Sequence, residues 1–528
     1  MSRDRVLVLT TGEKDWWWSM AEVLPTVERV WTAIGRSDRA EVRMLRVPLA
    51  PDVVEEVLVF APTRIVVTVV TPGTIEVATS LRQRMAGRPP MILYMYGDAT
   101  EGLHAFGGFA DILTERDTFV CSSEADAAAT RRCFPRADVV AIPFPLVDQF
   151  VLNRGPQGPV SVRLAYVGRV SEQKNLHTLL LALWIVRAVY GETPGLDVYG
   201  AVDGLGSPNM GLTFPDYGEY LRRLTARLGL EDTVTWHGFM PRDWLFDHVH
   251  TAPHAMVSPS LHSDENFGSS VLASLVNGQQ VVTTEWGGHV AYRQWFPEQL
   301  TLVPVHRTTT GPAIDPVALA HAIRLALGRA SAVSVSDADL DRARTAFSER
   351  IVVARTLTLL DRPCGDAVPL AKSPEQRHLD RQRARFGGGR KIFEDYADPV
   401  ARLFFEAYGM RAALTFDAGE SYVLPPWVEL VDGVLRVDDP HRGSTSYPVE
   451  TEAAEPVILT ACPSMDTMRL PLTLAEALVT SGYAFVLPRV TGPATRDVED
   501  DGRRVGLAQL DPGRHAPDPR RGDRSIRA

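Results

Sequence analysis

The stretch Ala255-Met-Val-Ser-Pro-Ser-Leu-His-Ser-Asp-Glu-Asn-Phe-Gly268 decides the fold that this sequence predicts. Its first four residues form an apolar run typical of a buried parallel strand, and a helix is expected from Ser269 to Asn277. Between them, Glu265 stands before a turn that contains glycine. A carboxylate there can accept hydrogen bonds from sugar hydroxyls while the turn amides hold neighbouring oxygens. The stretch therefore predicts an α/β unit with a ligand at the carboxyl end of its strand.

A second unit of the same kind lies earlier in the chain. The apolar run Leu164 to Val167 ends in Gly-Arg169-Val-Ser-Glu-Gln-Lys174, and an apolar helix is expected over Leu176 to Tyr190. Two cations together with the free amides of a helix N-terminus can neutralise a pyrophosphate, and Asn175 is the expected N-cap. Taken alone, the two cations fit solvated loop charges better than a phosphate site.

Short apolar runs alternate with helix-like segments through two successive parts of the chain. This alternation predicts an α/β fold with parallel sheets whose faces are both covered. The strands are expected at 5–10, 64–70, 91–96, 118–122 and 139–143 in the first part, and at 162–167, 196–199, 234–239, 255–258 and 281–284 in the second. A further mixed region is expected to contain strands at 422–424, 428–435 and 456–460 and a helix at 474–481.

A third motif, Trp286-Gly287-Gly288-His289, follows the last of those strands. With the three motifs in place, the sequence resembles the retaining nucleotide-sugar glycosyltransferases of family 4 over about residues 3–361, and most closely over 162–300. The resemblance implies the GT-B architecture, in which two Rossmann-like domains face a cleft, here with a C-terminal α+β extension. The expected parts are an acceptor domain at 1–155, a donor-binding domain at 160–340, a closing helix and linker at 341–370, an accessory module at 391–495 and a disordered tail at 496–528.

The resemblance also implies an activity, in which a hexosyltransferase moves a sugar from a nucleotide diphosphate sugar to an unidentified acceptor hydroxyl with retention and without a metal or other cofactor. It places the donor phosphates at Arg169 and Lys174, and the donor sugar hydroxyls at Glu265. Gly12 resembles the family's glycine loop near the phosphates, although a tight turn explains a glycine there equally well. The amides expected to hold the sugar and phosphate belong to Asn266, Phe267 and Gly268.

Two positions depart from the family's pattern. The second glutamate, which holds the nucleotide ribose in the family, is replaced by Ala273. Losing one such hydrogen bond costs about 0.5 to 1.5 kcal/mol, so we expect weaker binding and not its loss. The family's histidine in the N-terminal half falls at Tyr96-Gly97-Asp98. We therefore expect Tyr96 to offer its backbone carbonyl to the developing cation and Asp98 to orient an acceptor hydroxyl.

Composition limits the partners. The net charge of -10 over 528 residues offers no general attraction to nucleic acid. Four cysteines without paired spacing, and no apolar run long enough to cross a bilayer, indicate a cytoplasmic protein without a transmembrane segment. His248 and His250 would point apart on a helix, so no metal site is expected.

Two other functions compete with the transferase. Ala273 and Tyr96 also suit a non-catalytic nucleotide-sugar binding protein descended from such enzymes. The basic run Arg377 to Lys391 would suit an enzyme whose acceptor is DNA or another macromolecule, with 370–528 as its recognition module, although the acidic net charge disfavours nucleic acid. Among further candidates, Trp16, Trp17 and Trp18 fit either acceptor recognition or interdomain packing, and His262 and His289 lie close to the donor motifs.

Overall fold

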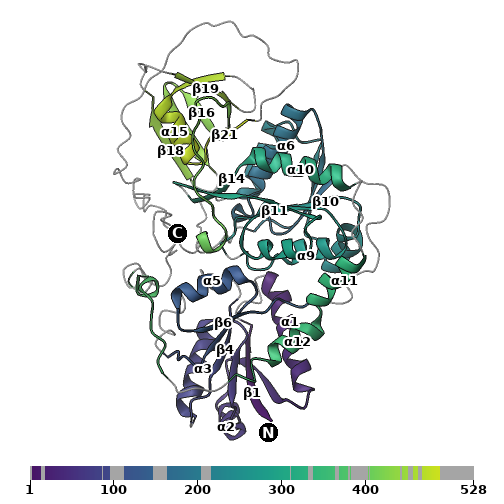
Figure 1. The fold of residues 1–528 in the computed structure, drawn as a ribbon, viewed down its shortest axis with the longest axis vertical. Helices are drawn as coiled ribbons and strands as arrows, with labels where there is room; N and C mark the ends of the chain where they lie inside the picture. The colour runs from purple at the N-terminus through teal and green to yellow at the C-terminus, as the bar shows by residue number, and fades with distance from the viewer. Residues whose placement is uncertain are drawn as a thin grey trace, which may run out of the picture.

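The first of two parallel sheets is formed by the N-terminal part of the chain in the computed structural model (Figure 1). Its six strands lie in the order β2-β1-β3-β4-β5-β6, and every neighbouring pair is parallel. They are β1 (Asp4–Thr11), β2 (Ala40–Val47), β3 (Arg64–Val67), β4 (Met91–Met95), β5 (Thr118–Cys121) and β6 (Asp138–Ala141). The structure describes residues 3–12, 18–85, 87–95, 112–146, 163–203, 216–263, 265–309, 311–330, 337–362, 368–378, 381, 402, 405–439, 443–449, 456–461 and 467–487.

Alternate side chains of a strand point to opposite faces of the sheet. Both faces of this sheet are covered, as the side chains of β1 show. Leu7 and Leu9 of β1 pack in one buried cluster, and Val6 and Val8 pack in another. All four side chains are fully buried, which explains the continuous apolar run in the sequence. The helices of this half are α1 (Trp18–Gly35), α2 (Pro51–Phe60), α3 (Pro72–Arg84) and α5 (Glu124–Cys133).

The second sheet also has six parallel strands, in the order β12-β11-β10-β7-β8-β9. They are β7 (Arg163–Val167), β8 (Gly195–Tyr199), β9 (Val234–Gly238), β10 (Ala255–Ser258), β11 (Val281–Thr284) and β12 (Leu300–Val303). The helical elements around it are η2 (Glu172–Lys174), α6 (Leu176–Tyr190), α7 (Tyr217–Arg227), α8 (Arg242–Leu245), η3 (Phe246–His250), α9 (Ser269–Val276), η4 (Gly287–Gln294), α10 (Pro316–Ala330) and α11 (Asp337–Ala346).

The strand order of the second sheet reverses between β7 and β10. From β7 the chain adds β8 and β9 on one side, and then returns to add β10, β11 and β12 on the other. In such sheets, ligands bind outside the carboxyl ends of the strands at the point of reversal. The loops that follow β7 and β10 carry Arg169 and Glu265, so the fold places both motifs at this point.

The C-terminal strands lie at the end of the second sheet that is remote from the first sheet (Figure 1). A four-stranded sheet has the order β20-β19-β15-β21, and β16, β17 and β18 form a three-stranded one. The elements of this part are β13 (Val305–Thr308), β14 (Gly311–Ile314), β15 (Tyr422–Leu424), β16 (Val428–Val431), β17 (Val434–Asp439), β18 (Gly443–Pro448), β19 (Pro456–Ala461), β20 (Thr467–Pro471), α15 (Leu472–Thr480) and β21 (Phe485–Val486).

The sequence analysis predicted one strand of this part wrongly. Residues 428–435 were expected as a single strand, but β16 and β17 are joined by the tight turn Asp432-Gly433. Both turn residues have positive φ, 51° and 74°. This backbone is typical of a two-residue hairpin, and the Asp-Gly pair was its signal in the sequence.

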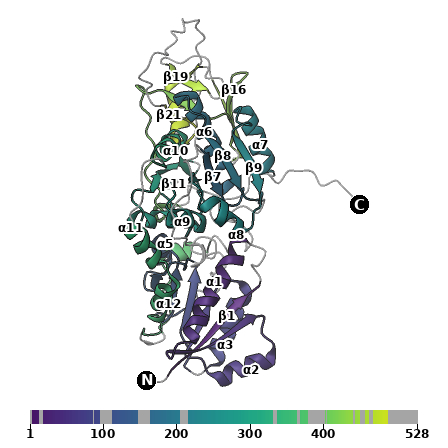
Figure 2. The ribbon, with the colours of Figure 1, turned by 90° about the vertical axis from the view of Figure 1, so that its right-hand side faces the viewer.

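The chain returns from the second half to the first through α12 (Glu349–Leu357). Both ribbon views place α12 beside the first sheet, where it packs against α1 (Figures 1 and 2). After this helix, the Arg64 guanidinium donates to the carbonyl oxygens of Leu360 and Arg362, each at 2.9 Å. The predicted α/β class with two Rossmann-like sheets and additional C-terminal strands is confirmed. Within the described ranges, no helix combines the length and apolarity needed to span a bilayer.

Candidate active site at the carboxyl edge of the second sheet

Lys174 and Glu265 meet where the loops after β7 and β10 come together. The Lys174 ammonium lies 2.5 Å from Oε2 of Glu265, and only 16% and 10% of the two side chains are exposed. The Ser260 hydroxyl donates to the same carboxylate oxygen, and Lys174 Nζ lies 3.4 Å from that hydroxyl. The interpretation of Lys174 as a solvated loop charge is therefore wrong.

The charge of this pair controls its protonation. Burial acts to raise the pKa of Glu265. The positive charge of Lys174, its hydrogen bond to the carboxylate, and the neighbouring His289 and His262 together outweigh burial and hold that pKa well below its usual range. Burial lowers the pKa of Lys174, and the carboxylate of Glu265 opposes this effect. Oε2 of Glu265 is thus occupied by two donors, whereas its other oxygen, Oε1, receives no hydrogen bond from the described residues.

Arg169 lies in the same loop as Lys174 and is also largely buried, with 14% of its side chain exposed. Its guanidinium forms an ion pair with Asp203, which follows β8. The Arg169 carbonyl accepts a hydrogen bond of 2.7 Å from the Tyr166 hydroxyl. Asp203 was missed in the sequence analysis. Its position in the loop after an expected strand was the available signal.

Asn175 occupies the expected N-cap position of α6, but its side chain does not cap the helix. It has left-handed backbone angles, φ 60° and ψ 34°, and its side chain makes no capping hydrogen bond. Instead, its side-chain oxygen accepts from the Thr178 hydroxyl at 2.6 Å, and its amide donates to the Pro259 carbonyl at 3.3 Å. The side chain therefore ties the start of α6 to the loop after β10.

His289 is completely buried beside Glu265, with Nε2 at 3.7 Å from Oε1 of the carboxylate. Its Nδ1 lies 2.8 Å from the Thr283 hydroxyl, which itself donates to the Ser258 carbonyl. Burial lowers the pKa of His289, and burial together with Lys174 lowers that of His262 well below the ordinary value.

The turn that follows Glu265 presents backbone amides at the start of α9. Among the described residues, no acceptor receives the amide protons of Asn266, Phe267 or Gly268. Gly268 has a φ of 70°, and a Cβ atom there would lie 2.5 Å from Nε2 of His289. Glycine is therefore required at this position. Free amides at a helix start attract anions and hydroxyl oxygens.

The first half contacts this turn directly. The Ser122 hydroxyl, just after β5, donates to the Asn266 carbonyl at 3.3 Å. Phe144 packs edge-on against Phe267, with ring centroids 5.1 Å apart. The two halves therefore meet at the residues expected to bind the donor.

The remaining candidates are distributed as follows. Gly12 directly follows β1, and Ala273 lies half-buried on α9. His248 stacks on Trp244 and His250 bonds to Ser274, and the described residues contain no cluster that would hold a metal. Four further candidates lie outside the described residues: Tyr96, Asp98, Trp16 and Trp17.

Comparison with known proteins agrees with this geometry. Residues 161–292, which contain the Arg169, Lys174 and Glu265 loops, match the family described as Glycosyl transferases group 1. No curated protein matches the chain.

Among solved structures, the chain is similar to Anabaena HepE in complex with UDP and glucose, with 14% identity, a TM-score of 0.45, and coverage of 68% of this chain and 100% of that one. It is also similar to the lipopolysaccharide outer core galactosyltransferase WaaB in its apo form, with 13% identity, a TM-score of 0.47 and coverage of 68% and 99%. Such identities carry no information on substrates. The similarity to the glycosyl transferases group 1 family is confined to residues 161–292 of this chain.

Proposed function

We propose that this protein is a glycosyltransferase that binds a nucleotide diphosphate sugar at the carboxyl edge of its second sheet. One observation carries the proposal: the ion pair of Lys174 and Glu265 lies, at the reversal of strand order, beside three backbone amides that have no acceptor among the described residues. Oε1 of Glu265 is an acceptor for sugar hydroxyls, and the amides of 266–268 are donors for sugar and phosphate oxygens. The match of 161–292 to a glycosyl transferase family supports the same assignment.

The chemical task is to stabilise a departing nucleoside diphosphate. Negative charge grows on the leaving group in the transition state, while positive character grows on the sugar. Lys174, Arg169 and the N-terminus of α9 supply preorganised positive potential for the diphosphate. Donor binding lets the phosphates compete with Glu265 and Asp203 for these cations. The first half, which touches Asn266 and Phe267, supplies the acceptor side.

The finer assignments also belong to the proposal. We infer a hexosyltransferase of family 4 that retains the anomeric configuration, needs no metal and works in the cytoplasm. The family resemblance of the three motifs supports these assignments, and the acceptor is not identified by them. Tyr96 and Asp98 keep the roles expected from the sequence. The alternative with DNA as acceptor is not favoured, because the net charge of -10 offers no general attraction to nucleic acid.

A panel of UDP-, GDP-, ADP- and dTDP-sugars tests the proposal, with release of the nucleoside diphosphate as the readout. We expect slow hydrolysis of one donor without acceptor, unaffected by chelator, and proton NMR of the first sugar product should show the donor's anomeric configuration. Inversion would remove the retaining assignment only.

Ala273 favours a second candidate, a non-catalytic protein that binds nucleotide sugars. Calorimetric binding of one nucleotide sugar without any turnover would select this candidate over the enzyme. Neither binding nor turnover of any donor would reject both.

A further inference from the structure

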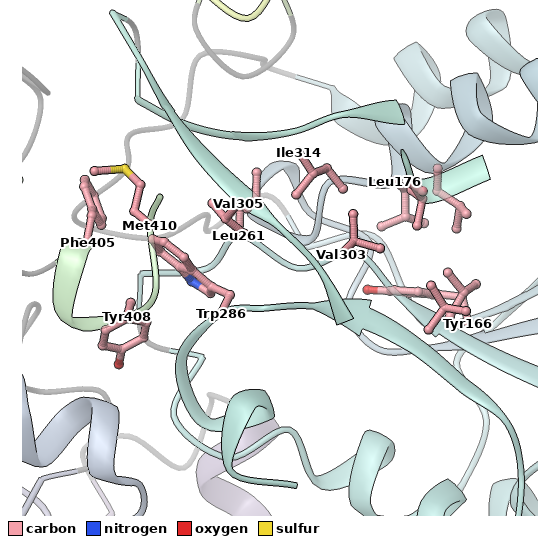
Figure 3. Packing of buried hydrophobic residues seen from close by; sticks show 14 of the residues in the cluster. Tyr166, Leu176, Leu261, Trp286, Val303, Val305, Ile314, Phe405, Tyr408 and Met410 are labelled. Carbon is pink, nitrogen blue, oxygen red and sulfur yellow. The ribbon is translucent and has the colours of Figure 1, made fainter. Parts of the chain in front are cut away.

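A short C-terminal segment, residues 405–411, packs beneath the loop that follows β11; we call it the bracing segment. Phe405 and Tyr408 are 2% and 1% exposed. Their ring centroids lie 5.7 and 5.4 Å from that of Trp286 in this loop. Figure 3 shows Trp286 between these side chains and the rest of the second half's core, with the Tyr408 hydroxyl pointing away from it. The segment therefore completes the packing around Trp286.

The backbone of the bracing segment also supports the loop. The Gly287 amide donates to the Tyr408 carbonyl at 2.8 Å, and the next amide, Gly288, donates to the Glu265 carbonyl at 2.8 Å. A Cβ atom on Gly287 would lie 2.2 Å from the Glu265 carbonyl oxygen and 2.8 Å from the Tyr408 ring. Because the two glycines have no side chain, the loop fits closely between the bracing segment and the stretch that holds Glu265.

Further contacts fix the segment to the second half. The Arg411 amide donates to the Val305 carbonyl at 2.8 Å, and the Arg411 carbonyl accepts from the Arg307 amide at 3.0 Å. The Arg411 side chain forms an ion pair with Glu285, directly before Trp286. The segment is therefore held along its length, and Tyr408 is fixed relative to Gly287.

The Tyr408 hydroxyl reaches the other half of the molecule. It donates a hydrogen bond to the carboxylate of Asp126, in the first turn of α5, and Asp126 is completely buried. This bond runs from the C-terminal segment to the first half, close to the point where Ser122 donates to Asn266. Tyr408 therefore connects α5 with the loop that supports Glu265.

We propose that Tyr408 is a positioning residue: it joins Asp126 of the first half to the Gly287-Gly288 loop of the second, and so fixes the Glu265 stretch relative to the acceptor side. The bracing segment thereby gives the C-terminal part of the chain a role in catalysis, although its strands lie away from the site. The catalytic consequence rests on the proposed function, whereas the mechanical connection does not.

The mechanical connection is tested by hydrogen–deuterium exchange with mass spectrometry on the full chain. Tyr408→Phe removes the hydroxyl and keeps the ring. We expect faster exchange in peptides covering 285–289 and 123–127 than in the wild type, without a change in overall secondary structure. Tyr422→Phe is the matched control, because among the described residues its hydroxyl bonds only to Asp417, which belongs to the C-terminal part. Unchanged exchange in both peptides of Tyr408→Phe would overturn the proposal, whatever the enzyme's activity.

The catalytic consequence is tested on the donor identified by the panel. Losing the hydrogen bond between Tyr408 and Asp126 should lower kcat/KM by up to about tenfold, mostly through kcat, because positioning is lost and donor contacts remain. Asp126→Asn should act in the same direction, and the double variant should be no worse than Tyr408→Phe alone. Losses of kcat/KM that add up in the double variant, or an equal loss in Tyr422→Phe, would contradict the positioning role of Tyr408. Absent turnover in the wild type would reject the proposed function and leave the exchange result to decide the connection.

Discussion

Lys174 and Glu265 are 91 positions apart in the sequence, yet their side chains form a buried ion pair across the carboxyl ends of β7 and β10. Burial removes both charges from water, which costs free energy that their mutual attraction offsets. Removing one partner therefore leaves an uncompensated buried charge. The pair therefore couples the stability of the second half to its site.

Lys174→Met should destabilise the protein by about 3 to 5 kcal/mol, because Glu265 stays buried without its cation. Arg222→Met is the control, since Arg222 forms an exposed pair with Glu219 and its loss should cost less than about 1 kcal/mol. Urea unfolding monitored by circular dichroism measures both. Equal losses of stability in the two variants would show that the Lys174 pair is not buried in solution.

Acid should destabilise the second half through His250. Burial lowers the pKa of His250 from 6.5 to about 3. Because the folded pKa lies below the unfolded one, the unfolded chain binds the proton first and stability falls as the pH drops below about 6.5. Between pH 6.5 and 5, this one group should cost about 2 kcal/mol.

His250→Gln should remove this part of the acid sensitivity, even though it loses the 2.9 Å contact with Ser274. The measurement compares the change in unfolding free energy between pH 7 and 5 for the wild type and the variant. The same change in both proteins would mean that His250 titrates normally in the folded state.

Gly268→Ala should abolish donor binding, because a Cβ atom would collide with His289 and displace the amide turn. Gly191→Ala is a matched control. Gly191 has the same φ of 70°, but a Cβ atom there meets nothing within 4 Å. The control should lose only about 1 kcal/mol of stability from backbone strain and should bind donor normally. Calorimetric titration with the donor distinguishes the two, and equal affinities would exclude the turn from the site.

Ala273→Glu should strengthen nucleotide binding about tenfold or less, since it restores a carboxylate for the ribose at a half-buried position of α9. Ala273→Met adds comparable length without an acceptor and should give no gain. Dissociation constants for the nucleoside diphosphate provide the comparison. A gain in both variants would indicate apolar contact and not ribose recognition.

Much of the fold could be predicted because central parallel strands are buried on both faces. The run at 255–258 and the apolar helix at 176–190 have the predicted boundaries. Strand β2 was not predicted, because it lies at an edge of the sheet and alternates exposed charges such as Glu41 with apolar residues. Strand β12, the edge of the second sheet, was not predicted either.

The residues of the site could be predicted from the sequence, but the ion pairs between them could not. The sequence placed Glu265 and the two cations near a ligand. It could not show that Lys174 bonds to Glu265, or that Asp203 bonds to Arg169, because these contacts depend on loops from different strands. The bracing segment was equally hidden, since Tyr408 and Asp126 are 282 positions apart.

The most direct test of the proposed function is nucleoside diphosphate release from the donor panel by the wild type, Glu265→Gln and the control Glu429→Gln, whose glutamate forms an exposed pair with Arg227. Glu265→Gln keeps the shape of the side chain but removes the charge that orients Lys174 and the sugar hydroxyls. The account predicts that the wild type and Glu429→Gln release one nucleoside diphosphate at the same rate, and that Glu265→Gln is slower by at least about a hundredfold. Equal release by the wild type and Glu265→Gln would contradict it.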